Sequence, residues 1–176
     1  MRKKKYFFFF PILLILLLIV PCFTLVDVLI LDNVYSGEKY FLNIVSNGAS
    51  ISVEFLHSYD KDHVVEIFEV EDNMFKPVKV VYSSDTYDYR ELRYNSTSRI
   101  EYGRIVLYIK DNVRFKSITY QIAYLAPQKL TVTVDDESYE YYLQWFGKKG
   151  EAVKLEVVKI PYIMFMIYRR GVNFEK

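Results

Sequence analysis

Two hydrophobic patterns divide the chain. Residues 6–31 form an almost unbroken apolar run, whereas most segments after residue 38 alternate apolar and polar positions with a period of two. An apolar helix of roughly 20 residues is long enough to cross about 30 Å of hydrocarbon. Alternation with a period of two is typical of β-strands with one buried face. The pattern therefore predicts a membrane anchor over 6–31 and a β-domain over 32–176.

The alternating part of the chain predicts a series of short strands with turn-forming residues between them. In the segment 64–70, Val64, Glu66, Phe68 and Val70 fall on one face, and Val65 with Ile67 on the other. Pro77 predicts an edge position or a bulge in its strand. The expected strands are 39–45, 51–56, 64–70, 75–82, 100–109, 117–124, 130–134, 139–146 and 152–160, with 87–94 as strand or loop.

About nine or ten short antiparallel strands, with no long helical pattern outside the anchor, predict an all-β fold. We expect one small sandwich or barrel-like domain. The apolar run 160–168 is too short to span a membrane as a helix and is predicted to be the last strand. A tail that touches the membrane is the alternative, because Arg169 and Arg170 follow the run.

The N-terminal segment is expected to remain uncleaved. Residues 1–5 carry four consecutive cations, which predicts that they stay in the cytoplasm and that the β-domain lies outside it. A signal peptide would end at a small-residue cleavage site, which is missing around Pro21. Cys22 also suggests a lipidated cysteine, but Pro21 stands where such sites need a small residue. Cleavage and lipidation remain the alternatives to an anchor.

Composition and charge exclude several classes of function. The chain has 23 Lys and Arg against 22 Asp and Glu, and four of the cations belong to residues 1–5. The remaining domain is close to neutral, so it offers no basic field for nucleic acid. The only cysteine lies in the predicted anchor, which leaves the β-domain without disulfides. The 17 tyrosines fit a half-buried β-surface.

The densest polar cluster lies between the strands 51–56 and 64–70. If these strands form a hairpin, the two histidines and the carboxylates gather near its tip. The cluster is interpreted as a polar turn, as a binding site or, as a third choice, as a metal site, because imidazole and carboxylate are zinc ligands. The residues in question are His57, Ser58, Tyr59, Asp62, His63 and Glu66, with His57, His63 and Glu66 as the metal candidates.

Two further polar segments are candidates for function. Arg90 near Tyr87 could hold a carboxylate ligand, since a guanidinium presents paired donors; a surface loop with local ion pairs is the simpler interpretation. Asn95 begins the sequon Asn95-Ser96-Thr97, which is an acceptor for glycosylation if the domain lies outside the cell. We find no nucleophile elbow, phosphate-binding glycine loop or dinucleotide fingerprint, so nothing in the sequence requires an enzyme or a cofactor.

The hairpin residues resemble the domain of unknown function 1850 family. That family shows an H-S-[VI] motif at the end of one strand and E-x-[YF] on the next. Here His57-Ser58-Tyr59 is similar to the first motif, with Tyr59 in place of the usual valine, and Glu66-Ile67-Phe68 is similar to the second. The similarity covers about residues 42–160. The family's glycine-rich segment has no counterpart at residues 83–89.

The resemblance implies a small exported or membrane-anchored protein that assists a transporter of the TRAP type, TAXI class. It therefore favours a non-catalytic accessory protein that contacts a permease or a solute-binding protein. The alternatives are a direct binder of a small anionic or sugar-like solute, through His57, Tyr59, Tyr87 and Arg90, and a divalent-metal enzyme.

Overall fold

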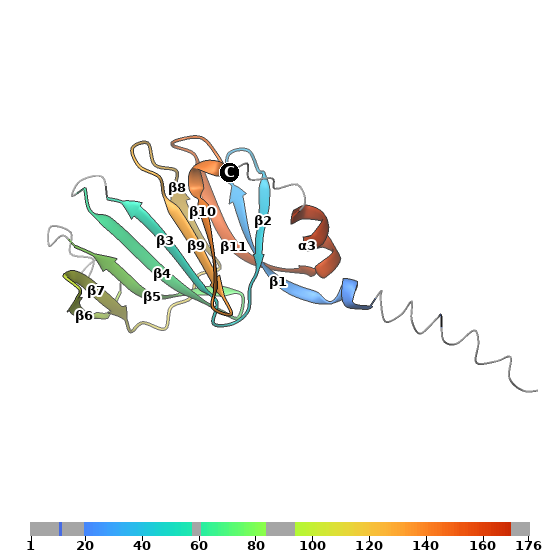
Figure 1. Ribbon diagram of the computed structural model, residues 1–176, viewed down its shortest axis with the longest axis horizontal. Coiled ribbons are helices and arrows are strands. Elements are labelled where there is room, and N and C mark those ends of the chain that lie inside the picture. The colour runs from blue at the N-terminus through green and yellow to red at the C-terminus, as the bar shows by residue number, and fades with distance from the viewer. Residues whose placement is uncertain (1–10, 12–19, 58–60, 84–93, 170–176) are drawn as a thin grey trace, which may run out of the picture.

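A computed structural model describes Pro11 and residues 20–57, 61–83 and 94–169. Eleven strands within these residues form two antiparallel sheets, with one short α-helix at the C-terminal end (Figure 1). The elements are η1 (Val20–Phe23), β1 (Leu25–Asn33), β2 (Lys39–Ile44), β3 (Ser50–Leu56), β4 (His63–Glu71), β5 (Met74–Tyr82), β6 (Ser96–Glu101), β7 (Arg104–Ile109), β8 (Ser117–Gln121), β9 (Lys129–Val134), β10 (Glu137–Tyr142), η2 (Leu143–Trp145), β11 (Ala152–Pro161) and α3 (Tyr162–Arg169). The predicted all-β class is confirmed.

The two sheets share one hydrophobic core. The four-stranded sheet has the order β2-β1-β11-β8, and the seven-stranded sheet has the order β10-β9-β3-β4-β5-β7-β6. Leu29 and Leu155 enter the core from the smaller sheet, and Ile51 and Leu130 enter it from the larger one. Strands of both sheets alternate buried and less buried residues, as expected for sheets with one face on the core.

The predicted end of the anchor at residue 31 is wrong, because β1 begins at Leu25 and forms a central strand of the smaller sheet. Leu29 and Leu31 face the main core, while Val28 and Ile30 are buried with Phe165 of α3 on the opposite face. A strand that is covered on both faces has apolar residues at successive positions and does not alternate with polar ones. The sequence of β1 therefore looks like a continuation of the apolar run that precedes it.

The N-terminal prediction is otherwise outside the described residues. Residues 1–5 and most of 6–19 are not among them. Within residues 20–57, 61–83 and 94–169, no helix has the length and apolar character needed to span a bilayer.

Two further predictions of secondary structure are corrected. The apolar run 160–168 forms the end of β11 and the helix α3, and the expected strand 100–109 is the β6–β7 hairpin. Its turn is Tyr102-Gly103, with φ angles of 51° and 75°. Pro77 lies beside a register shift between β4 and β5, which confirms the predicted bulge, although β5 is an inner strand.

The turn residue Tyr102 yields the first prediction. A two-residue turn with positive φ at both positions favours Asn-Gly, and the Tyr102 side chain is fully exposed. Tyr102→Asn is therefore expected to raise the free energy of unfolding by about 0.5–1 kcal/mol, measured by urea denaturation of the full chain in detergent. Ile100→Asn, on the neighbouring strand of the hairpin, is the control and should give no gain, because asparagine is unfavourable within strands.

Candidate functional site

The β3–β4 hairpin forms as predicted and presents alternate residues to the inside of the molecule. Leu56 pairs with His63 and Val53 with Glu66. Val64, Glu66, Phe68 and Val70 are buried on the inner face of β4, which confirms the predicted face of the strand. Glu66 is thus a single carboxylate in an otherwise apolar row, and it is only 6% exposed.

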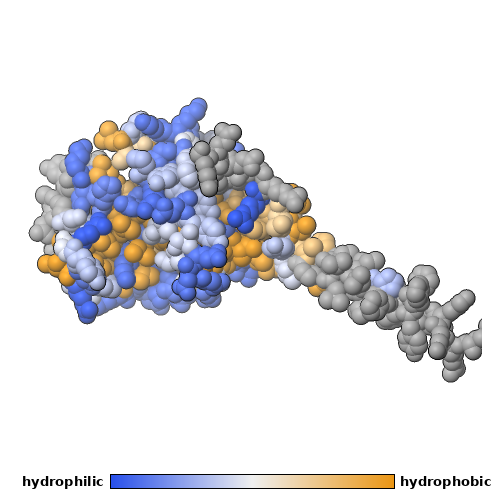
Figure 2. All heavy atoms as spheres, viewed as in Figure 1, coloured by the Kyte–Doolittle hydropathy of each residue, from blue (hydrophilic) through white to orange (hydrophobic). Residues whose placement is uncertain are grey.

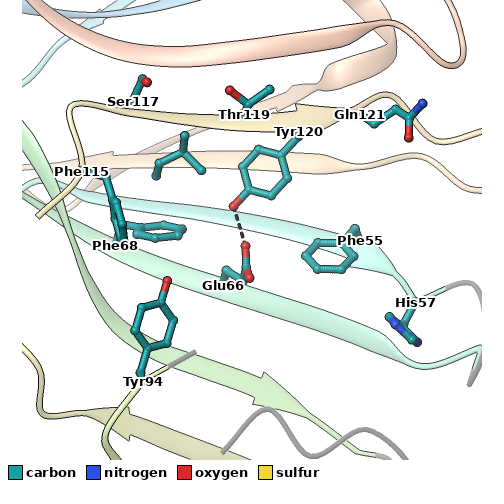
Figure 3. Close-up of a pocket in the computed structure, with 11 residues that line it drawn as sticks. Phe55, His57, Glu66, Phe68, Tyr94, Phe115, Ser117, Thr119, Tyr120 and Gln121 are labelled. Carbon is teal, nitrogen blue, oxygen red and sulfur yellow. Dashed lines mark hydrogen bonds between the residues drawn. The ribbon is translucent and has the colours of Figure 1, made fainter. Parts of the chain in front are cut away.

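Glu66 meets a tyrosine from the other sheet. The hydroxyl of Tyr120, on β8, donates a hydrogen bond of 2.7 Å to Glu66 Oε2 (Figure 3). β8 is an edge strand of the smaller sheet, and β4 lies in the middle of the larger one. The bond therefore joins the two sheets where the smaller sheet ends. A hydrogen bond to a charged acceptor is among the stronger ones in proteins, which favours this arrangement.

A cleft of about 440 Å³ opens beside this bond. Its walls come from β3, β4, β8 and the residues just before β6 and β8. Figure 3 shows side chains from both sheets directed toward it. The lining residues are Phe55, His57, Glu66, Phe68, Tyr94, Phe115, Ser117, Ile118, Thr119, Tyr120 and Gln121. This volume is in the range of small-molecule sites, and the lining combines five phenylalanine and tyrosine rings with five polar or charged side chains.

The position of Phe115 in the cleft wall depends on contacts before β8. The backbone groups of Phe115 and Phe75 exchange two hydrogen bonds, which attach the segment to β5. Arg114 forms an ion pair with Glu71, with 3.0 Å between Arg114 Nη2 and Glu71 Oε1. The hydrogen bond from Arg114 lowers the pKa of Glu71. These contacts hold Phe115 beside the inner face of β4.

His57 and Glu66 line the same cleft but do not lie side by side. His57 directly follows β3, and the strand partner of Glu66 is Val53, four residues earlier. Four residues of a strand span about 13 Å. Figure 3 accordingly shows His57 at one end of the cleft and Glu66 near its middle. The two residues therefore contact different parts of any bound molecule.

The proposed metal set is not brought together. His63 lies three residues from Glu66 on β4, so the two side chains leave opposite faces of the strand. The His63 ring lies on the outside, 3.2 Å from Glu54 Oε1. Among the described residues, no group of three or more metal-binding side chains lies close enough to hold an ion. The structure therefore does not bring His57, His63 and Glu66 together as the metal site that the sequence offered as a third choice.

The other predicted site residues have varied positions. Ser58, Tyr59, Tyr87 and Arg90 lie outside the described residues. Asp62, at the tip of the hairpin, accepts hydrogen bonds from the backbone and hydroxyl groups of Ser83 at the end of β5. The sequon residue Asn95 is exposed just before β6, so its side chain is accessible to modification.

Sequence reasoning missed Tyr94, Phe115 and Tyr120. Alternation through β8 and the residue after it marks Ile118, Tyr120 and Ile122 as residues of one face, which was the only signal available for Tyr120. In comparisons with known proteins, no family model, curated protein or solved structure matches the chain.

Proposed function

We propose that this protein is a non-catalytic binding domain that is held outside the cytoplasm by a membrane anchor and takes a small sugar-like solute in the cleft between its sheets. The main support for this proposal is the Glu66 carboxylate, which is buried among aromatic rings and hydrogen-bonded to Tyr120. An ionised carboxylate is an acceptor only, so it selects ligand groups that donate hydrogen bonds, such as hydroxyls.

The lining supports a neutral or amino sugar over an anion. Phe55, Phe68 and Phe115 supply apolar ring faces, while the Tyr94 and Tyr120 hydroxyls both donate and accept. The described lining residues include one carboxylate and no lysine or arginine, a composition that favours a neutral or cationic ligand over an anion. An anionic ligand would depend on Arg90, which is outside the described residues.

The proposed location of the protein, outside the cytoplasm at a membrane, rests on the sequence. With β1 beginning at Leu25, the apolar segment from residue 6 to residue 24 is about 19 residues long, which is within the range of about 17–25 that spans a bilayer. The four cations at residues 2–5 favour a cytoplasmic N-terminus and a β-domain outside the cytoplasm. The link to solute uptake comes from the family resemblance alone.

A thermal-shift experiment tests the cleft. The full chain in mild detergent is screened with neutral sugars, amino sugars and dicarboxylates, and unfolding is followed by the fluorescence of Trp145. A ligand at 100 times its Kd adds about 2.7 kcal/mol, which corresponds to a rise in Tm of roughly 5–10 °C for a domain of this size. We expect such a rise for a sugar, and we expect Glu66→Gln to weaken that sugar's binding at least tenfold, since it removes about 1.5–3 kcal/mol of charged hydrogen bonding.

Glu69→Gln is the matched control, because Glu69 lies on the outer face of the same strand. It should bind the sugar as the unaltered protein does. Glutamine at position 66 still offers an oxygen to Tyr120, so the substitution is compatible with the fold. If no sugar raises Tm, or if Glu66→Gln and Glu69→Gln bind equally well, the cleft is not the binding site.

Co-purification tests the transport role separately. If the protein is an accessory of a transporter, a permease or a solute-binding protein should co-purify with it when it is isolated from its native membrane in mild detergent. Recovery without either partner contradicts the transport role and leaves the result for the cleft unchanged.

A further inference from the structure

The helix α3 is apolar on every side. Its sequence, YIMFMIYR, has no charged residue before Arg169. One side packs on the outer face of the smaller sheet: Phe165 is 2% exposed and is buried with Val28 and Ile30. On the same side, the ring of Tyr168 stacks on Phe41, with 4.8 Å between the ring centroids. This contact accounts for only one stripe of the helix.

The second stripe of α3 faces away from the sheet. Ile163, Met166 and Ile167 have the i, i+3, i+4 spacing that places them on one side of a helix. Together with Cys22 and Tyr162 they line a shallow apolar hollow between α3 and η1. The side chain of Ile167 is 59% exposed. A helix that is apolar all round is normally covered on both sides, so this stripe requires a cover.

The exposed apolar surface continues onto the start of the described chain. The backbone N–H of Tyr162 donates a 2.9 Å hydrogen bond to the carbonyl of Thr24, which holds α3 beside η1. Figure 2 shows hydrophobic atoms gathered over α3 and the first residues of β1. We call this surface the α3 patch; it consists of the exposed residues Val20, Phe23, Leu25, Met164, Met166 and Ile167.

The chain itself indicates what covers the α3 patch. Before Val20 the sequence continues as an apolar run and then four cations. The patch therefore surrounds the point where the β-domain joins the proposed membrane anchor. No acidic residue occurs in η1 or α3, and Arg169 ends the helix. Tyr162 and Tyr168 are residue types that are enriched at membrane surfaces.

We propose that α3 lies flat in the headgroup region of the bilayer, with Met166 and Ile167 inserted into lipid. The proposal rests on the proposed membrane anchor and adds a second contact to it. An anchor alone leaves the domain free to rotate about its tether, whereas two contacts fix its orientation. The β6–β7 hairpin, at the opposite end of the molecule from α3 in Figure 1, then points away from the membrane.

A spin label at Ile167 measures this contact. In a Cys22→Ser background, Ile167→Cys is labelled with a nitroxide, and the full chain is reconstituted into vesicles of phosphatidylcholine with one quarter phosphatidylglycerol. We expect the label to collide more with oxygen than with a water-soluble nickel complex, at a depth of about 5–10 Å into the boundary between headgroups and acyl chains. The same label at the exposed turn residue, Tyr102→Cys, is the matched control and should report water.

A second substitution tests whether the apolar character of the patch causes the insertion. Ile167→Glu is made with the label at Met164→Cys. Since Ile167 is exposed, the substitution should leave the Tm unchanged, and the label at residue 164 should move from lipid to water. Tyr102→Glu should leave the depth of the label at residue 164 unchanged.

Flotation of the vesicles separates the two proposals. A chain that does not float with lipid contradicts the anchor and the docking of α3 together. A chain that floats while its label at residue 167 reports water contradicts the docking and leaves the anchor standing. Spin–spin broadening at residue 167 without lipid contact would show that a second copy covers the patch, and this result would also overturn the proposal.

Discussion

Leu29→Ala is expected to lower the free energy of unfolding by about 2–5 kcal/mol, the usual cost of removing a buried leucine from a tight core. Leu29 is completely buried and lies in the main core between the two sheets. Its strand partners are Val157 of β11 and Asn43 of β2. The loss arises from apolar surface that no longer contacts the core and from the cavity that remains.

The matched control is Leu25→Ala in the same strand. The Leu25 side chain is 62% exposed at the first position of β1, so its truncation should change the free energy of unfolding by less than about 0.5 kcal/mol. Urea denaturation of the full chain in detergent measures both variants. If residues 25–31 were the end of a membrane helix, both variants would leave the unfolding of the β-domain unchanged.

This comparison addresses the least predictable element of the fold. Membrane helices and strands buried on both faces have the same apolar sequences, and only tertiary structure distinguishes them. Val28 to Leu31 are all buried, two on each face of the sheet. The run Leu25–Leu31 therefore belongs to β1 of the β-domain and not to the predicted anchor.

The helix α3 was missed for a related physical reason. A helical period cannot be read from eight residues of which seven are apolar or aromatic. The one local signal was Pro161, since proline is common at helix starts. Phe165, on the buried stripe of α3, covers Val28 and Ile30 on the outer face of β1. This one contact accounts for the burial of that stripe and for the burial of β1 on both faces.

The candidate site was predictable only in part. Period-two alternation placed Glu66 on the inner face of β4, because neighbouring strand residues point to opposite sides. Its partner Tyr120 lies 54 residues away on the other sheet. Alternation specifies the face of a residue but not its neighbour across the core. The cleft itself could therefore not be derived from the sequence.

Asn33 is the buried polar residue that links the end of β1 to the loop before β11. It is 2% exposed, and its Oδ1 accepts hydrogen bonds from the backbone N–H groups of Tyr35 and Ser36, each 3.0 Å long. Its Nδ2 donates to the Phe146 carbonyl at 2.9 Å and to Glu151 Oε2 at 3.0 Å. All of the hydrogen-bonding positions of this amide are thus used.

Gly147 permits the close approach of these groups. A Cβ atom at this position would lie 2.5 Å from Asn33 Nδ2 and 2.8 Å from Glu151 Oε2, which is too close for either contact. The hydrogen bond from Asn33 also lowers the pKa of Glu151 below its ordinary value of 4.5. The carboxylate form of Glu151 is therefore favoured by folding.

Asn33→Ala is expected to lower the free energy of unfolding by about 2–4 kcal/mol at pH 7, because it removes four hydrogen bonds and leaves the buried Phe146 carbonyl without this partner. The cost should be smaller at acid pH. A lowered pKa contributes stability above the ordinary value of 4.5, and this contribution is lost as the pH falls through the pKa of the folded state. Urea denaturation at pH 7 and pH 3.5 gives the comparison.

The exposed residue Asn112 supplies the control: Asn112→Ala should change stability by less than about 0.5 kcal/mol at either pH. Equal effects at both asparagines would mean that the Asn33 network does not stabilise the junction between β1 and β11.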